Sequence, residues 1–269
     1  MAEPARVRDL ELDPHAGDEP KIRLTDLHKS FGPKVVLDGI DLEVREGESL
    51  VLIGGSGTGK SVLLKHMIGL LSPDRGTVEV DGVDLATLDN RAITQFRRRF
   101  GMAFQEGALF DSMTVRENVA FPLRRQTRRS FDEIYARADR CLELVKLEGV
   151  GEKMPSQLSG GMKRRVGFAR AIALEPAIVL FDEPTTGLDP VTTALINDVI
   201  LELLGRLDST AITITHDMTS AFRIADRIGM LYAGKIIALA PPDEFRRLDD
   251  PRVRQFIEGR AEGPLGRES

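Results

Sequence analysis

The chain of 269 residues is 42% hydrophobic and only 5% aromatic, which is enough apolar material for one or two domains with aliphatic cores. Its 37 basic and 42 acidic side chains give a formal net charge of −5, which argues against a nucleic-acid-binding protein because such proteins carry a basic excess. The single cysteine excludes an internal disulfide and a thiolate zinc site, and we expect Cys141 to be a buried, inert side chain. The apolar runs are strand-sized and shorter than the roughly 18 residues of a membrane helix, so we expect a soluble protein.

The N-terminal part predicts a β-rich segment behind an extension. Residues 1–20 are rich in proline and acidic side chains and lack an apolar segment, so we expect a mobile extension rather than a secretory signal. From residue 21 onward, apolar patterning predicts strands over 21–31, 34–44 and 48–54, with turns at Asp38-Gly39 and Glu46-Gly47. A helix over 59–68 and a strand with its turn over 77–82 follow.

The segment between the third strand and this helix fits the pattern G-x-x-x-x-G-K-[ST], with Gly54, Gly59, Lys60 and Ser61 at the fixed positions. The backbone N–H groups of such a loop point inward and, with the positive end of the following helix, form an anion site. We therefore predict that Lys60 reaches the β- and γ-phosphates of a nucleoside triphosphate and that Ser61 ligates Mg²⁺. Kinases, GTPases and motor ATPases share this loop, so the loop alone leaves the reaction open.

Residues 105–176 predict a mostly helical insert, with helices over about 131–145 and 161–174. Ser159 precedes two glycines and can cap the second helix, which creates another anion-binding helix end far along the chain from the first. One nucleotide rarely needs both ends from one chain, which suggests that Ser159, Gly160 and Gly161 clasp a nucleotide held by another copy. Basic clusters at 97–99, 124–129 and 163–165 are solvated faces by default; the second could instead meet anionic lipid headgroups.

The α/β pattern returns after the insert, with strands over 177–182, 210–215, 227–234 and 235–240 and a helix over 190–204. The first of these strands ends in two acids. We expect Asp182 to hold Mg²⁺ through water and Glu183 to polarise the attacking water as a general base. His216 follows the next strand; a lone histidine is usually structural, but its neighbouring motifs favour a contact with the γ-phosphate.

Together these motifs resemble the ATP-binding subunits of ABC transporters over residues 21–248. In this resemblance residues 54–61 are the Walker A loop, Leu158–Met162 the signature and Asp182-Glu183 Walker B. It implies an α/β P-loop NTPase fold with a RecA-like core, an antiparallel β subdomain and a helical subdomain over about 105–176. Met162 replaces the usual Gln of the signature and Gly55 the usual Pro of the loop, but neither change removes a phosphate donor.

The resemblance also implies ATP and Mg²⁺ as cofactors and assigns residues to them. The residues that it assigns to ATP are the adenine-stacking Phe31, then Gly54, Gly55, Ser56, Gly57, Thr58, Gly59, Lys60, Ser61 and Val62, and finally Gln105 of the Q-loop, Asp182 and His216. The residues that it places across a dimer are Ser159, Gly160, Gly161 and Asp189 of the D-loop. The Mg²⁺ ligands that it implies are Ser61, Gln105 and Asp182, and the catalytic residues Glu183, His216, Lys60 and Gln105.

Within the family, segments such as "GALFDSMTVRENVAFPL" and "DPRVRQF" are similar to the Mla/Mkl-type ATPases of bacterial Mce-protein lipid transporters. That similarity implies a homodimer on the cytoplasmic face of the inner membrane, with an integral-membrane permease, Mce-domain and accessory subunits, and a phospholipid or related lipid as cargo. An ATPase for a polar-solute importer is the alternative within the family. The single cassette and the acidic net charge argue against a soluble, non-transport ABC ATPase. The presence of Glu183 and His216 argues against a nucleotide-binding regulator without turnover.

The C-terminal tail, residues 249–269, contains one short amphipathic turn. Val253, Phe256 and Ile257 fall at the i, i+3, i+4 spacing of a helix. One apolar turn is too short to fold alone in water, so the tail packs either on its own α/β core or on a second copy. The sequence leaves both possibilities open.

Overall fold

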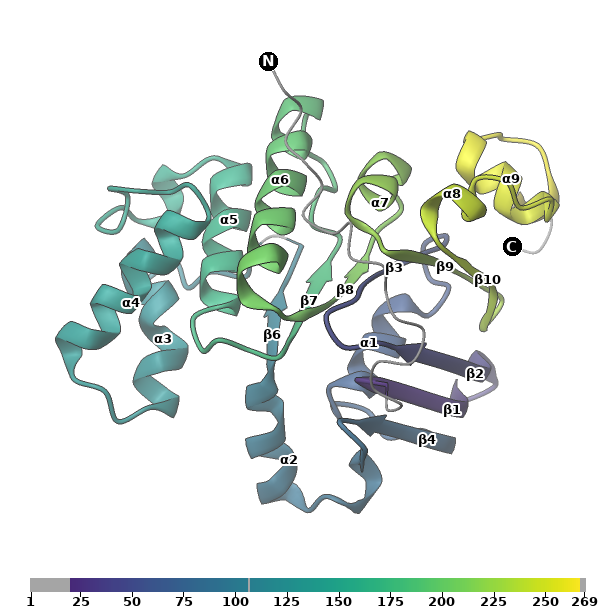
Figure 1. The fold of residues 1–269 in the computed structure, drawn as a ribbon, viewed down its shortest axis with the longest axis horizontal. Helices are drawn as coiled ribbons and strands as arrows, with labels where there is room; N and C mark the ends of the chain where they lie inside the picture. The colour runs from purple at the N-terminus through teal and green to yellow at the C-terminus, as the bar shows by residue number, and fades with distance from the viewer. Residues whose placement is uncertain (1–19, 106, 267–269) are drawn as a thin grey trace.

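The computed structural model describes residues 20–105 and 107–266, and these form two sheets with helices around them (Figure 1). Nearly all of the extension expected at residues 1–20 lies outside the described residues. The smaller sheet is antiparallel and has the order β2-β1-β4-β5. Its strands are β1 (Ile22–Phe31), β2 (Lys34–Val44), β4 (Arg75–Val80) and β5 (Val83–Asp84).

The larger sheet has the order β10-β9-β3-β8-β7-β6 and is parallel except at its β10 edge. Its strands are β3 (Ser49–Ile53), β6 (Phe100–Ala103), β7 (Ile178–Asp182), β8 (Thr210–Ile214), β9 (Arg227–Tyr232) and β10 (Lys235–Ala240). The helices are α1 (Lys60–Met67), α2 (Asn90–Phe96), α3 (Val115–Gln126), α4 (Phe131–Leu144), α5 (Gly160–Ala171), α6 (Pro190–Leu207), α7 (Met218–Ile224), α8 (Pro242–Phe245) and α9 (Pro251–Glu258). Short 3₁₀ segments lie at Leu85–Thr87, Arg97–Arg99, Pro155–Gln157 and Pro264–Gly266.

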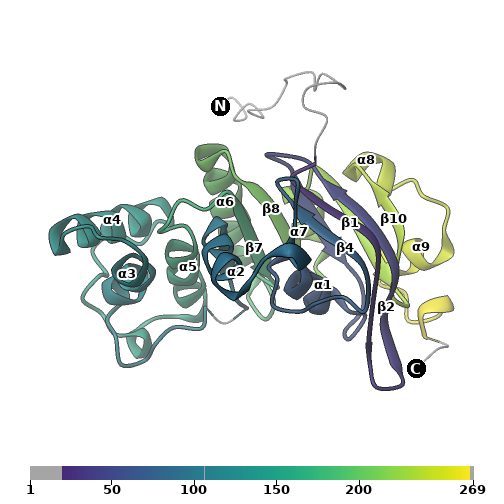
Figure 2. The same cartoon turned by 90° about the horizontal axis from the view of Figure 1, so that it is seen from below.

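The larger sheet separates two hydrophobic cores, because neighbouring side chains of a strand point to opposite faces. Along β3, Val51 and Ile53 join the core beneath α5, α6 and α7, whereas Leu50 and Leu52 join the core that α1 and the small sheet cover. Figures 1 and 2 show these helices and the small sheet on opposite faces of the larger sheet. Burial on both faces explains why the parallel strands read as continuous apolar runs.

Helices α3, α4 and α5, which fall within the range predicted for the helical insert, pack on one another at one end of the molecule. Each of the first two begins with a capping box, in which a hydroxyl and a glutamate satisfy backbone N–H groups reciprocally: Thr114 with Glu117, and Ser130 with Glu133. The α4 helix matches the predicted range closely. Helices α2 and α3 and strand β6 were not predicted from the sequence.

The predicted turn at Asp38-Gly39 is wrong, whereas the one at Glu46-Gly47 is confirmed. Gly39 lies inside β2, where the pairing with β1 shifts register between Asp38 and Ile40. Its φ of +74° is readily available to glycine, and a Cβ at this position would lie 3.4 Å from Nε2 of His28. The glycine therefore marks a bulge inside a long strand and not a chain reversal.

The tail packs on its own core, as one of the two predicted alternatives requires. Val253 of α9 is fully buried in the core beneath α6 and α7, and Phe256 and Ile257 pack against the same core. Asp250 caps α9, and its carboxylate accepts a hydrogen bond from the N–H of Arg252 at 2.8 Å. Within the described residues, no helix combines the length and hydrophobicity needed to cross a bilayer.

Candidate functional site

The predicted catalytic residues gather at one edge of the larger sheet. Strands β3, β8, β7 and β6 are neighbours and run parallel, so their C-terminal ends meet at this edge. Lys60 follows β3, His216 follows β8, Glu183 follows β7 and Gln105 follows β6. Ligands of open α/β sheets bind outside the carboxyl ends of the strands, so the topology places these side chains where a ligand would sit.

The phosphate loop needs glycine at particular positions for steric reasons. Gly54 has a φ of +152°, and a Cβ there would lie 2.4 Å from the carbonyl oxygen of Leu231. Gly59 precedes α1 with a φ of +105°, and a Cβ would lie 3.0 Å from the carbonyl oxygen of Val36. The backbone of the loop is therefore pressed against β9 and β2, which fixes the direction of its N–H groups.

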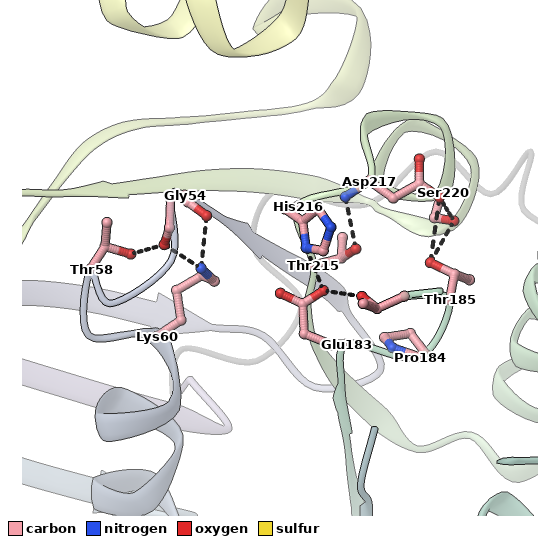
Figure 3. A network of polar contacts seen from close by, with 12 residues as sticks. Gly54, Thr58, Lys60, Glu183, Pro184, Thr185, Thr215, His216, Asp217 and Ser220 are labelled. Carbon is pink, nitrogen blue, oxygen red and sulfur yellow. Dashed lines mark hydrogen bonds and ion pairs between the residues drawn. The ribbon is translucent and has the colours of Figure 1, made fainter. Parts of the chain in front are cut away.

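Lys60 lies against the loop from within. Its ammonium donates to the carbonyl oxygens of Gly54 at 2.7 Å and Gly55 at 2.8 Å (Figure 3). Only 7% of Lys60 is exposed, and this burial lowers the pKa of its ammonium, while the charges of Glu183 and Asp182 oppose the shift. The loop thus contains a buried cation, which suits it to hold phosphate oxygens.

Asp182 and Glu183 are adjacent but lie in different surroundings. Glu183 takes a left-handed φ of +49°, and its N–H donates to the carbonyl oxygen of Ile214 at 2.9 Å. Burial raises the pKa of the Asp182 carboxyl, and the neighbouring Glu183 charge raises it further. A non-glycine residue with positive φ carries strain that surrounding contacts must maintain, and such residues cluster at active sites.

The Glu183 carboxylate is held from two sides (Figure 3). Its Oε2 accepts a hydrogen bond from the Thr186 hydroxyl at 2.8 Å and lies 2.9 Å from Nδ1 of His216. The side chain of Glu183 is 16% exposed and that of His216 is 57% exposed. The carboxylate is therefore sheltered and oriented, whereas the imidazole faces outward, where it can meet a bound phosphate.

A buried polar network lies behind His216. The Asp217 carboxylate caps α7 and accepts a hydrogen bond from the Ser220 hydroxyl at 2.6 Å. Ser220 in turn accepts from the amide of Asn197 on α6 at 2.9 Å, and the Thr185 hydroxyl faces the same Asp217 carboxylate at 3.4 Å. This network ties the residue after His216 to α6 and to the loop after Glu183. The network was not predicted from the sequence, where the Asp-x-x-Ser spacing at the start of α7 is its local signal.

The predicted Mg²⁺ ligands offer the right chemistry. Ser61 is the second residue of α1, Asp182 ends β7, and Gln105 lies exposed in the turn after β6. Hydroxyl, carboxylate and amide oxygens are the hard donors that Mg²⁺ prefers, and this ion usually takes one or two carboxylates together with substrate phosphates. Within the described residues, no group of three or more His, Cys, Asp or Glu side chains could hold a metal. The residues therefore fit a phosphate-bound Mg²⁺ and not an all-protein metal cage.

The signature residues lie apart from the phosphate loop. Ser159 caps α5 and its Oγ accepts a hydrogen bond from the Met162 N–H at 3.3 Å, as predicted. Helix α5 packs among α3, α4 and β6, and Figures 1 and 2 both place it away from α1. Asp189 caps α6 close by, because a Cβ on Gly161 would lie 2.5 Å from Cγ2 of Thr192 in the first turn of α6.

Phe31 belongs to the small sheet and not to the larger sheet that carries the catalytic side chains. It ends β1 at the hairpin with β2, is 49% exposed, and has the ammonium of Lys29 5.7 Å from its ring centroid. One chain therefore unites the phosphate loop with Asp182, Glu183 and His216, whereas the signature residues lie among the helices away from α1.

Comparison with known proteins identifies the family. Residues 37–186 match the family model described as ABC transporter. The chain is 42% identical over 245 residues to the probable ribonucleotide transport ATP-binding protein mkl of Mycobacterium leprae, covering 91% of this chain and 71% of the relative. This chain belongs to the ABC transporter family.

One further relative and one solved structure support the assignment of this chain to the ATP-binding cassettes of the family. The chain is 38% identical to the intermembrane phospholipid transport system ATP-binding protein MlaF of Escherichia coli (strain K12), covering 91% of both chains. It also superimposes with a TM-score of 0.75 and 33% identity on the dimeric post-hydrolysis structure of the ATP-binding cassette MJ0796 bound to ADP and Pi, covering 82% of this chain and 98% of that one. The predicted ABC ATPase fold is confirmed, and the cassette is an ATPase subunit of this family.

Proposed function

We propose that this cassette binds ATP with Mg²⁺ at the C-terminal edge of the larger sheet and hydrolyses it to drive a separate permease that moves phospholipid or a related lipid. The observation that carries the proposal is the sheltered carboxylate of Glu183, whose Oε2 lies 2.9 Å from Nδ1 of His216. Glu183 follows β7 and His216 follows β8, and these two strands are neighbours in the larger sheet. A general base must be oriented and must lie beside the phosphate that the water attacks.

Binding begins at the phosphate loop. Lys60 exchanges its carbonyl partners for the β- and γ-phosphate oxygens, which are better partners for a buried cation. Phe31 stacks on adenine, and residues 54–62 surround the phosphates. Ser61, Gln105 and, through water, Asp182 would hold Mg²⁺, which would supply positive charge against the phosphate oxygens. Glu183 then accepts the proton of the attacking water, and His216 contacts the γ-phosphate and senses its loss.

Two copies share each nucleotide in this proposal. The phosphate loop of one copy faces four residues of the other: Ser159, Gly160, Gly161 and Asp189. Two observations support this arrangement: the signature helix lies away from the loop within one chain, and the related cassette MJ0796 is dimeric. ATP closes the dimer because its γ-phosphate contacts both halves, and hydrolysis removes that link. The difference in affinity between the closed and open states moves the permease.

The lipid cargo is supported by the MlaF relative, which is named for intermembrane phospholipid transport and matches this cassette along 91% of both chains. We infer the corresponding partners: a permease, Mce-domain and accessory subunits, on the cytoplasmic face of the inner membrane. The mycobacterial relative is named for ribonucleotide transport, which keeps a polar-solute importer as the second candidate. Mass spectrometry of small molecules that co-purify with the cassette–permease complex separates the two. ATP and ADP held by the cassette are expected in either case, so the deciding signal is lipid, and a complex without enriched lipid that carries a ribonucleotide other than ATP or ADP would refute the lipid assignment.

The hydrolytic mechanism is tested with Glu183→Gln. The amide preserves the shape and can still accept from the Thr186 hydroxyl, but it cannot take the proton of water. We expect unchanged ATP affinity, turnover lower by about 10²-fold or more, and accumulation of an ATP-bound dimer. Glu202→Gln is the control, because Glu202 pairs with Lys146 on the outer side of α6. Phosphate release by Glu183→Gln at the parental rate would refute the role of Glu183.

A further inference from the structure

Arg164 is a buried cation on the signature helix that reaches into the catalytic loop. It lies in α5, is only 7% exposed, and is not among the residues assigned to ATP. Its Nη1 donates to the carbonyl oxygen of Pro184 at 3.0 Å, and its Nη2 donates to the carbonyl oxygen of Thr186. The planar guanidinium therefore spans the two peptide carbonyls that flank Thr185, directly after the proposed general base.

The bridged segment also holds the base. The Thr186 hydroxyl donates to Oε2 of Glu183 at 2.8 Å, and the Thr186 N–H lies 3.4 Å from the Glu183 carbonyl oxygen. Glu183 keeps its strained φ of +49° only while such contacts hold it. The hydrogen bonds thus form a continuous chain from the Arg164 guanidinium through Thr186 to the Glu183 carboxylate.

The same face of α5 touches the next part of this segment. Gly161 and Arg164 are three residues apart and so share a face of the helix. Gly161 packs against Thr192, whose hydroxyl donates to the Asp189 carboxylate at 2.5 Å, and Arg164 packs against the loop before Asp189. One face of the signature helix therefore follows the chain from Pro184 to Thr192.

We propose that Arg164 is a positioning residue that makes the orientation of Glu183 depend on the position of the helical subdomain. When α5 moves, its guanidinium carries the two carbonyls with it and shifts the Thr186 hydroxyl that orients the Glu183 carboxylate. In the proposed dimer the partner copy faces Ser159 at the start of α5, so the position of that copy reaches the base within the same chain. This inference rests on the proposed role of Glu183 and deepens it.

The test compares Arg164→Gln with Arg165→Gln in the full chain. Arg165 is the next residue of α5, and its guanidinium likewise donates to two backbone carbonyls, those of Val145 and Lys146, at 3.2 and 2.8 Å, away from the catalytic loop. We expect Arg164→Gln to lower kcat by about 10- to 100-fold, since misplacing a catalytic group by about 1 Å costs that much, with the KM for ATP unchanged. Arg165→Gln should keep the parental kcat even if it lowers the melting temperature.

A double mutant distinguishes positioning from stability. If Arg164 acts through Glu183, the variant with both Arg164→Gln and Glu183→Gln should turn over no more slowly than Glu183→Gln alone. Thr186→Val removes only the hydroxyl that holds Oε2 and should reproduce the loss in kcat. Should Arg164→Gln fail to fold, Arg164→Lys replaces it, because a single ammonium keeps the charge but loses the planar fork and should give the same loss.

The outcomes separate this inference from the proposed function. Parental kcat in Arg164→Gln together with an inactive Glu183→Gln would overturn the positioning role and leave the base intact. Additive losses in the double mutant, or an equal loss of kcat in Arg165→Gln, would also overturn it. Parental turnover in Glu183→Gln would instead refute the proposed base itself.

Discussion

Gly161 offers a sharp test of how the signature helix meets the D-loop helix. Adding a Cβ there places a methyl group 2.5 Å from Cγ2 of Thr192, about 1 Å closer than two carbons normally approach. Thr192 cannot simply rotate away, because its hydroxyl donates to the Asp189 carboxylate at 2.5 Å. Gly160, the preceding residue, has open space where its Cβ would stand. Gly161→Ala and Gly160→Ala therefore form a matched pair.

The size of the effect follows from these contacts. Alanine gains up to about 1 kcal/mol of helix propensity over glycine, and both substitutions share this gain. Overpacking of a well-packed contact typically costs about 1–3 kcal/mol, and only Gly161→Ala incurs this cost. We therefore expect the free energy of unfolding of Gly161→Ala to lie about 1–3 kcal/mol below that of Gly160→Ala. Thr192→Ser removes Cγ2 but keeps the hydroxyl, so it should restore the difference.

Urea denaturation of the nucleotide-free chains measures these free energies. We expect a lower free energy of unfolding for Gly161→Ala than for Gly160→Ala. Adding Thr192→Ser to Gly161→Ala should remove this difference in free energy. Equal stability of the two alanine variants would show that α5 and α6 are not in contact at this point. Failure of Thr192→Ser to restore stability would place the strain elsewhere.

Three other predictions follow from the site and the core. Lys60→Ala and Ser159→Arg should each abolish ATP turnover. A mixture of the two variant proteins should recover part of the turnover, because a mixed dimer assembles one intact site. If Ser159→Arg alone released phosphate at the parental rate, the model of sites shared between chains would be refuted. Val253→Ala should lower the free energy of unfolding by about 2 kcal/mol, from two lost methyl groups and a cavity, with ATP-driven dimerisation unchanged in sedimentation; weaker dimerisation at unchanged stability would contradict own-core packing. Burial raises the pKa of the Cys141 thiol to about 11, whereas the thiol of the unfolded chain ionises near pH 8.5. The free energy of unfolding should therefore fall as the pH rises from about 8.5 to about 11, because only the unfolded chain loses the thiol proton in this range. Iodoacetamide should alkylate Cys141 at pH 9 only after the protein is unfolded.

The sequence alone determined the parts of the site that depend on contiguous residues. A glycine loop between a strand and a helix must expose its N–H groups whatever surrounds it, so residues 54–61 were recognisable without coordinates. The acids at the end of β7 and the histidine after β8 follow apolar runs long enough to read as buried strands. Helix α3 escaped prediction because Pro122 and several arginines disturb its pattern, although its capping box at Thr114 was a readable signal. Strand β6, with four residues, is too short for any periodicity.

Only the tertiary structure decided which side chains hold the catalytic groups. Arg164 bonds to backbone carbonyls about 20 residues away, and a carbonyl leaves no trace in the sequence because every residue has one. The three-residue step from Thr186 to Glu183 is short, but it forms a hydrogen bond only because Glu183 adopts a positive φ. The tail likewise has the same amphipathic pattern whether it packs on its own chain or on a second copy. The hydrophobic effect is non-directional, so the surface that buries Val253 depends on which apolar surface lies within reach.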